Sequence, residues 1–354
     1  MEHTLKHMRE QVLDAGASGT PLRLRGGASK DWYGNAARGA VLDTRAHRGI
    51  VAYDPTELVL TARCGTPLAE IDAALAEHGQ MLAFEPPHFG PGATLGGMFA
   101  SGLSGPRRQA AGALRDFVLG ARLMDGHGEL LRFGGQVMKN VAGYDVARML
   151  AGSLGTLGLV AEVSLKVMPL PFAQTTLQLA MGQQQALDTL DAWAGQPLPV
   201  SASAWHDGVL MLRLSGARAA VNAARRQIGG ELLDDAGPRW RALREQTHPF
   251  FAAAGPAPLW RLALPAATAA QALPWPQLLE WGGTQRWFHS PADGAQLHAM
   301  AAELGGHACR FRGAGQRSEV FQPLAPAVMA IHANLKRKFD PAGIFNPGRM
   351  YQEL

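Results

Sequence analysis

The amino-acid sequence predicts a globular protein of about two domains that contain both helices and strands. The chain has 354 residues, and at roughly 150 residues a domain this length suits two domains with a buried core. Hydrophobic residues make up 47% of the chain and charged residues 18%, as in an ordinary soluble protein. After Met168–Pro171, glycine clusters give way to segments rich in Ala, Gln, Trp and Pro. This change predicts a domain boundary near residue 171.

Several stretches have the alternation or the flanking turns that predict strands. Residues 21–25 alternate between apolar and basic side chains, and residues 58–62 form a short apolar run. Residues 117–124 and 129–133 are joined by a glycine-containing turn, which predicts a β-hairpin. Residues 159–168 predict the clearest strand of the chain, because every second side chain there is apolar.

Two helices can be predicted from their ends and from their apolar faces. Thr66 and Pro67 predict the start of the first helix, because Thr is a good N-cap and Pro loses no needed N–H at the first helical position. Gly79 predicts its end. The apolar face of this helix carries Leu68, Ile71 and Leu75. A second helix is predicted over residues 325–339.

Charge and cysteine content exclude several classes of function. The net charge is +4 and the pI is about 9.3, but the arginines are dispersed. The densest basic run, residues 336–338, is too short for a nucleic-acid site, and no nucleic-acid partner is expected. Cys64 and Cys309 are the two cysteines and form no C-x-x-C pair. The chain therefore carries no disulfide framework and no iron–sulfur or zinc site of its own.

The sequence contains no recognisable targeting or membrane segment. Its first sixteen residues are polar and lack the apolar core of a signal peptide. No apolar run approaches the roughly 20 residues that a membrane span requires. We therefore expect a cytoplasmic protein.

Glycine clusters are the most informative feature of the sequence. The Walker A pattern and the Rossmann G-x-G-x-x-G are both absent. Three other glycine elements remain, at residues 26–29, 92–105 and 152–158. Consecutive free backbone N–H groups can form a concave donor surface for phosphate oxygens. Taken singly, each element is better explained as a tight turn, but their order and spacing together favour two surfaces that hold a pyrophosphate.

Five segments in order give the sequence a family resemblance. They are GGAS at 26–29, ATLGGMFASGLSG at 93–105, RDFVLGARLMDGHGELLRFG at 115–134, KNVAGYDVARMLAGSLGTLGLVAEVSLKVMP at 139–169 and KRKFDPAGIFNPGR at 336–349. The chain resembles the FAD-linked oxidase family of the vanillyl-alcohol oxidase type, and within it the FAD-binding subunits of bacterial glycolate oxidases. The motifs cover roughly half of the chain.

The resemblance implies an α+β fold with a PCMH-type FAD-binding domain. In this family two α/β subdomains clamp an extended FAD, and a smaller α+β cap domain follows. The implied boundaries are residues 1–171 for the FAD-binding domain and 172–325 for the cap. Residues 326–354 would form a C-terminal segment that returns to the FAD-binding domain.

The resemblance also implies a set of FAD-binding residues. The backbone N–H groups that would meet the pyrophosphate belong to Gly26, Gly27, Ala28 and Ser29. The residues on its other side and at the ribose would be Thr94, Leu95, Gly96, Gly97 and Ser104. Gly158 and Val160 would approach the adenine, and Asn346 and Arg349 the flavin, although a C-terminal turn explains Asn346 equally well. Lys139, Asn140, Tyr144 and Asp145 could contact flavin or brace the core.

Two departures from the family pattern limit these expectations. Leu154 stands where many relatives have Glu, which removes one polar contact. No histidine occurs in residues 25–34, so a histidyl link to FAD at this loop is excluded and noncovalent FAD is expected. At Gly27 we expect a valine to occupy the space of a phosphate while leaving much of the fold intact.

A metal site and a catalytic base are not evident in the sequence. Relatives that oxidise 2-hydroxy acids unaided carry a GDGNLH-type segment and a further histidine in the cap. Residues 205–208 resemble that segment only faintly, and His298 and His307 have no recognised ligand spacing. We therefore expect no metal and assign no catalytic acid or base.

The resemblance implies an FAD-dependent oxidoreductase that works inside a larger complex. The complex would oxidise the small molecule glycolate to glyoxylate and pass electrons through flavin to an iron–sulfur subunit. A second FAD-containing subunit and that iron–sulfur subunit would be the partners, and membrane contact would be peripheral, through the complex. Two alternatives stay open: a self-contained FAD dehydrogenase for another 2-hydroxy acid or alcohol, and a structural subunit whose flavin site has decayed.

Overall fold

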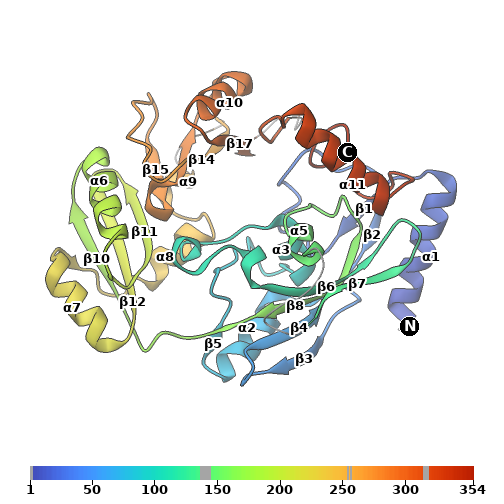
Figure 1. The fold of residues 1–354 in the computed structure, drawn as a ribbon, viewed down its shortest axis with the longest axis horizontal. Coiled ribbons are helices and arrows are strands. Elements are labelled where there is room, and N and C mark those ends of the chain that lie inside the picture. The colour runs from blue at the N-terminus through green and yellow to red at the C-terminus, as the bar shows by residue number, and fades with distance from the viewer. Residues whose placement is uncertain (1–2, 136–144, 253–254, 256, 314–318) are drawn as a thin grey trace.

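The computed structural model describes residues 3–135, 145–252, 255, 257–313 and 319–354. Figure 1 shows two parts side by side, each containing a β-sheet. A five-stranded sheet lies in one part and an eight-stranded sheet in the other. Both termini lie on the side of the five-stranded sheet, beside helices α1 (His3–Ser18) and α11 (Pro326–Phe339). Helix α11 matches the helix predicted at 325–339.

The five-stranded sheet is antiparallel and has the strand order β3-β4-β8-β6-β7. Its strands are β3 (Ile50–Asp54), β4 (Val59–Arg63), β8 (Leu159–Lys166), β6 (Val118–Met124) and β7 (Leu130–Gly134). The predicted hairpin is confirmed as β6 and β7. The predicted strand at 159–168 is confirmed as β8, which lies at the centre of the sheet because its alternate side chains are buried.

One face of this sheet packs against short helices. They are α2 (Leu68–Glu77), α3 (Leu95–Ser101) and α5 (Val146–Leu150), and 3₁₀ helix η1 (Leu114–Phe117) joins them. The predicted apolar face of α2 is confirmed: Leu68, Ile71 and Leu75 are completely buried in this core. Gly79 follows the C-cap with φ +62°, as its predicted role at the helix end requires.

The start of α2 differs from the prediction in one detail. Pro67, not Thr66, is the N-cap residue, and no side chain caps the helix. The Thr66 hydroxyl instead donates to the Arg63 carbonyl at 2.7 Å and accepts from the Gly49 N–H at 2.9 Å. Thr66 therefore joins two loops of the sheet, a use that a local capping pattern cannot reveal.

Strand β1 (Leu22–Arg25) begins the part of the chain that carries the first glycine element. It pairs in parallel with β2 (Ala40–Asp43), and α1 packs behind it against the end of the five-stranded sheet. The C-terminal residues run beside β1: Leu22 donates its N–H to the Ile344 carbonyl, and Asn346 donates its N–H to the Leu22 carbonyl. Two-residue strands β5 (Gln80–Met81) and β9 (Met168–Pro169) form a separate pair.

The eight-stranded sheet is antiparallel and buried on both faces. Its strands in spatial order are β13 (Glu231–Leu232), β10 (Ala173–Ala180), β12 (Val209–Gly216), β11 (Val200–His206), β15 (Gln277–Glu280), β16 (Gln285–His289), β14 (Leu259–Ala263) and β17 (His307–Arg312). Helices α6 (Gln183–Ala194), α7 (Arg218–Ile228) and α10 (Gly294–Glu303) cover the outer face. The remaining short helices are α4 (Arg108–Ala111), α8 (Gly237–Arg244), α9 (Pro249–Ala252) and η2 (Trp281–Gly283).

The inner face of the eight-stranded sheet packs on the first part of the chain. Tyr33, Leu103 and Leu154 from the first part share one apolar cluster with Trp287 and Phe311 from the sheet. The sheet begins at β10, two residues after position 171, but the predicted domain boundaries themselves stay a prediction.

Lys336 on α11 is a buried cation surrounded by oxygen atoms. Its ammonium pairs with the Asp340 carboxylate at 2.7 Å and donates to the carbonyls of Thr156, at 2.8 Å, and Phe345, at 2.7 Å. Asp340 in turn accepts the N–H groups of Ile344 and Phe345. This pair therefore fixes the C-terminal segment against both α11 and the third glycine element.

We expect Lys336→Met to lower the free energy of unfolding by about 3–5 kcal/mol, because it leaves the Asp340 carboxylate buried without its cation. Chemical denaturation followed by circular dichroism measures the change. Lys338→Met, at an exposed position of the same helix, is the control and should change the free energy little. A loss below about 1 kcal/mol for Lys336→Met would show that the pair does not stabilise the fold.

Candidate functional site

A groove runs between the three glycine elements and the C-terminal segment. It consists of two adjoining cavities that share Leu24, Gly26, Gly97, Ala100, Leu154 and Asn346. One cavity continues along Arg25, Thr44, Cys64, Gly96, Ser153, Gly155, Gly158, Leu159 and Val160. The other continues along Gly27, Ala28, Ser29, Lys30, Asp31, Thr94, Ser101 and Arg349. We call the whole the glycine groove.

The glycine groove brings together most of the residues that the sequence predicts for cofactor binding. Those that line it are Gly26, Gly27, Ala28, Ser29, Thr94, Gly96, Gly97, Gly158, Val160, Asn346 and Arg349. Leu95 does not line it, because its side chain is completely buried in the core. Ser104 does not line it either, and its hydroxyl accepts the Leu114 N–H at 3.1 Å. Lys139, Asn140 and Tyr144 lie outside the described residues, and Asp145 caps α5.

The first glycine element offers the groove a row of backbone donors. Among the described residues, none accepts a hydrogen bond from the N–H groups of Gly27, Ala28 and Ser29. Ala28 has φ +61°, a conformation that turns successive N–H groups toward one side of the chain. Three neighbouring donors without partners are the arrangement that binds phosphate oxygens.

Neighbouring segments of the chain leave no room for a side chain at Gly26 or Gly27. A Cβ at Gly26 would lie 2.3 Å from the Thr94 hydroxyl, and a Cβ at Gly27 would lie 1.4 Å from the Gly92 carbonyl oxygen. The expectation that valine at position 27 leaves much of the fold intact is therefore wrong. Any side chain there displaces the loop that leads into α3, because backbone atoms already fill the space.

In the second glycine element, three N–H groups donate to other parts of the protein or to the helix cap. The Leu95 N–H donates to the Thr66 carbonyl, and the Gly96 N–H to the Cys64 carbonyl at 2.7 Å. The Gly97 N–H donates to the Thr94 hydroxyl, which caps α3. This side of the groove therefore presents small residues and the Thr94 hydroxyl, whereas the first element presents three successive N–H groups without an acceptor among the described residues.

Asn346 and Arg349 hold the groove together. The Asn346 amide accepts the Leu24 N–H at 2.9 Å and donates to the Leu154 carbonyl at 2.6 Å, so both of its ends are occupied. The Arg349 guanidinium donates to the Asp31 carbonyl at 2.8 Å and also to the Asn35 carbonyl. Both residues thus connect the C-terminal segment to the other walls, and their predicted contact with flavin stays a prediction.

Three residues that line the groove adopt a left-handed backbone conformation. Ala28, Leu154 and Asn346 have φ values of +61°, +53° and +42°. Each such residue costs on the order of 1–3 kcal/mol, and strain of this kind persists where the surroundings over-determine it. Leu154, the position at which many relatives carry Glu, places an apolar side chain in the groove instead.

Lys30 is a groove residue that the sequence reasoning missed. Its amine lies 3.2 Å from the His88 carbonyl oxygen and 3.4 Å from the Ser29 hydroxyl. Burial lowers the pKa of this amine to about 8, although the charge of the Glu245 carboxylate acts to raise it. The signal was present, since a Lys follows the glycine turn directly. Lys30 supplies a positive charge beside the three free N–H groups.

These features fit a dinucleotide. The unpaired N–H groups and the Lys30 ammonium suit a diphosphate, and the apolar Leu24, Leu154 and Val160 suit flat rings along the rest of the groove. Cys64 also lines it, but burial raises the pKa of its thiol to about 12, which keeps it unreactive. Among the described residues no three His, Cys, Asp or Glu side chains could hold a metal ion.

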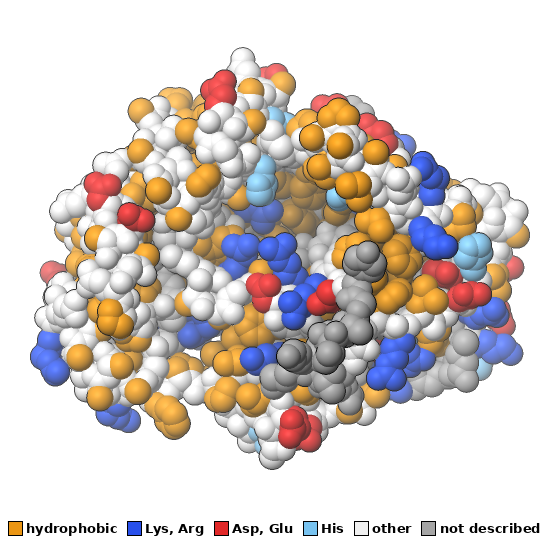
Figure 2. Space-filling model, viewed as in Figure 1, with side chains coloured by type: hydrophobic (Ala, Val, Ile, Leu, Met, Phe, Trp, Pro, Cys, Tyr) orange, Lys and Arg blue, Asp and Glu red, His pale blue; other side chains and the backbone are white. Residues whose placement is uncertain are grey.

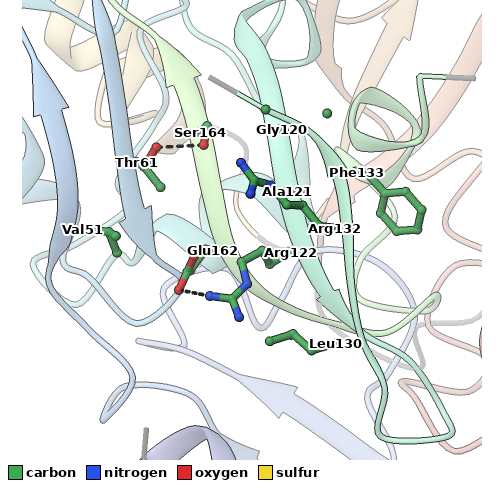
Figure 3. A pocket seen from close by; sticks show the side chains of 12 residues that line it. Val51, Thr61, Gly120, Ala121, Arg122, Leu130, Arg132, Phe133, Glu162 and Ser164 are labelled. Atoms are coloured by element: carbon green, nitrogen blue, oxygen red, sulfur yellow. Dashed lines mark hydrogen bonds and ion pairs between the residues drawn. The ribbon is translucent and has the colours of Figure 1, made fainter. Parts of the chain in front are cut away.

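A larger cavity of about 370 Å³ lies on the open face of the five-stranded sheet. Figure 3 shows two pairs among its polar side chains, Arg122 with Glu162 at 2.8 Å and Thr61 with Ser164 at 2.8 Å, and Arg132 also lines it. Its walls are strands whose backbone donors serve the sheet ladder. Among the described residues this cavity therefore offers side-chain donors such as Arg132, but no row of successive backbone N–H groups like that of Gly27, Ala28 and Ser29.

No helix within the described ranges is long and apolar enough to cross a membrane.

Comparison with known proteins agrees with the chemistry of the groove. A family model described as "FAD binding domain" matches residues 3–134. The chain is 50% identical over 345 residues to glycolate oxidase subunit GlcE of Escherichia coli (strain K12), across 98% of this chain and 97% of that protein. It is 32% identical over 139 residues to glycolate oxidase subunit GlcD of Bacillus subtilis (strain 168), across 39% of this chain and 29% of that protein.

A solved structure shares the fold of the chain. Alkyldihydroxyacetonephosphate synthase superimposes with a TM-score of 0.65 across 97% of this chain and 75% of that chain, at 15% identity. At this identity the likeness shows the fold alone. It confirms the predicted α+β fold class.

We expect Lys30→Met to weaken FAD binding at neutral pH and to flatten its pH dependence. A diphosphate beside Lys30 raises the pKa of the amine above about 8, its value in the free protein. The ammonium therefore contributes fully below pH 8, and its contribution is lost as pH rises through the higher pKa of the bound state. Fluorescence titration of FAD from about pH 7 to about pH 10 measures the effect.

The controls for this experiment are Lys30→Arg, which keeps the charge, and the exposed Lys338→Met. Both should retain most of the wild-type affinity at neutral pH. Superimposable pH profiles for the wild type and Lys30→Met would contradict a diphosphate position beside Lys30.

Proposed function

The chain belongs to the FAD-binding oxidoreductase family of glycolate oxidase subunit GlcE, and we propose that it is the FAD-binding subunit of a glycolate oxidase complex. The complex oxidises glycolate to glyoxylate, and electrons pass through the flavin to an iron–sulfur subunit. The observation that carries the proposal is the glycine groove, with the unpaired N–H groups of its first element, in a chain that matches the Escherichia coli subunit over 98% of its residues.

In this proposal different groove residues bind different parts of FAD. Gly27, Ala28 and Ser29 donate their N–H groups to the diphosphate, and the Lys30 ammonium balances its charge. Gly158 and Val160 leave space for the adenine. The bound flavin would accept two electrons as a hydride and release them singly, which links an organic substrate to one-electron carriers.

We propose that the FAD is held without a covalent bond. Residues 25–34 contain no histidine, and among the described residues that line the groove there is none. The Cys64 thiol stays protonated, because burial raises its pKa to about 12. Acid precipitation should therefore release the flavin into the supernatant.

Two further subunits are proposed as partners: a second FAD-containing subunit and an iron–sulfur subunit. The support is the cysteine content, because an iron–sulfur cluster takes four ligands and the chain has two cysteines. Both cysteines are buried, Cys64 beside the groove and Cys309 in the eight-stranded sheet. Electrons that leave the flavin singly would therefore need another chain. Membrane contact is proposed to be peripheral, through these partners.

The arrangement of sheets also supports the proposed domains. Residues 1–171 and 326–354 would form the FAD-binding domain, because they supply the groove. Residues 172–325 would form the cap, which carries the eight-stranded sheet.

The decisive comparison is between the lone chain and the chain purified with its partners. We expect the lone chain to carry about one FAD and to oxidise glycolate poorly with an artificial electron acceptor, and the complex to be fully active. Full activity of the lone chain would show a self-contained dehydrogenase instead. A flavin-free chain inside an active complex would show a structural subunit with a decayed site.

A further inference from the structure

A cavity of about 610 Å³ lies beside the start of helix α10, a volume within the range of small-molecule sites. Figure 1 shows α10 next to β17, in the part of the molecule that carries the eight-stranded sheet. The walls include Trp260 on β14, Arg310 on β17 and His298 on α10. Their apolar portion consists of Pro258, Pro291, Ala292 and Pro323. Among the described residues, none lines both this cavity and the glycine groove, so a ligand here would have a site of its own.

Two ring nitrogens at this cavity are buried without a hydrogen-bond partner. Trp260 and His298 both line it, with exposed fractions of 2% and 7%. Their rings meet edge to face, with centroids 5.7 Å apart. Neither Nε1 of Trp260 nor Nε2 of His298 makes a hydrogen bond. The indole N–H can only donate, and a buried donor without an acceptor is unfavourable, so the two rings favour a ligand that brings an acceptor.

The start of α10 adds backbone donors to the same cavity. Asp293 is the N-cap residue, but its carboxylate makes no capping hydrogen bond. The N–H groups of Gly294, Ala295 and Gln296 have no acceptor among the described residues, and the first two of these residues line the cavity. His298 follows Gly294 by four residues and therefore lies on the same side of the helix. The positive end of the helix and the buried rings together favour a carboxylate or a similar anionic group.

The rim of the cavity carries negative charge. Its charged side chains, among the residues that the structure describes, are Asp293, Glu319 and Arg310, so two exposed carboxylates stand against one guanidinium. Neither carboxylate forms an ion pair within the described ranges. Figure 2 shows, by contrast, Lys and Arg side chains gathered in the hollow between the two parts of the molecule. The rim would repel a simple anion, whereas a simple cation would leave the buried N–H donors without an acceptor.

We propose that this cavity binds a free α-amino acid with an apolar side chain. Such a molecule carries a carboxylate and an ammonium on one carbon atom, so it supplies both the acceptor and the cation. The carboxylate accepts from Trp260, from His298 and from the start of α10, and the ammonium pairs with Asp293 and Glu319 at the rim. The apolar side chain packs on the proline rings of the wall. This site is additional to the proposed function and does not depend on it.

The test is calorimetric titration of the purified full chain with L-leucine and with two analogues, isocaproate, which lacks the ammonium, and isoamylamine, which lacks the carboxylate. We expect leucine to bind, and each analogue to bind about tenfold more weakly or worse. His298→Phe should weaken leucine binding about tenfold, because it removes a buried donor and keeps a ring in its place. Glu319→Gln and Asp293→Asn should each weaken it about threefold, because exposed ion pairs are weaker.

Glu303→Gln, at an exposed position near the other end of α10, is the matched control and should bind leucine normally. Failure of the wild type to bind either leucine or phenylalanine would overturn the inference. So would unchanged leucine affinity in both Glu319→Gln and Asp293→Asn, two exposed substitutions that do not endanger the fold. Isocaproate that binds as tightly as leucine would show an anion site instead, and isoamylamine that does so would show a cation site.

Discussion

The side-chain amide of Asn346 joins the walls of the glycine groove, and the position of the other groove residues depends on it. One end of the amide holds the N–H of Leu24 on β1, and the other holds the carbonyl of Leu154. Gly155 must be a glycine beside it, because a Cβ there would lie 2.8 Å from the amide nitrogen. The buried Lys336–Asp340 pair holds the same C-terminal segment from behind. The groove is thus built by residues far apart in the sequence.

This construction separates the residues that hold the groove from those that are free to hold a ligand. The donors of Asn346, Arg349 and the second glycine element are used within the protein. The N–H groups of Gly27, Ala28 and Ser29 have no acceptor among the described residues, and the Lys30 ammonium, which donates to the His88 carbonyl and the Ser29 hydroxyl, adds its charge beside them. A motif that is shared within a family can therefore consist of residues that build the groove or of residues that bind the ligand. The hydrogen bonds of each residue distinguish the two roles.

Much of the fold could be predicted from the sequence, because local periodicity determines it. The alternation in β8 and the apolar face of α2 were sufficient to place those elements. Thr66 was predicted to cap α2, but its hydroxyl instead accepts the N–H of Gly49, which is distant in the sequence. At the site, glycine spacing identified the groove but not which donors are free.

The most direct measurement of the central claim is an experimental structure of the chain purified with FAD. We expect the diphosphate to lie within hydrogen-bond distance of the N–H groups of Gly27, Ala28 and Ser29, with the adenine toward Val160. A diphosphate elsewhere, for example at Arg122 and Glu162 on the open face of the five-stranded sheet, would contradict it.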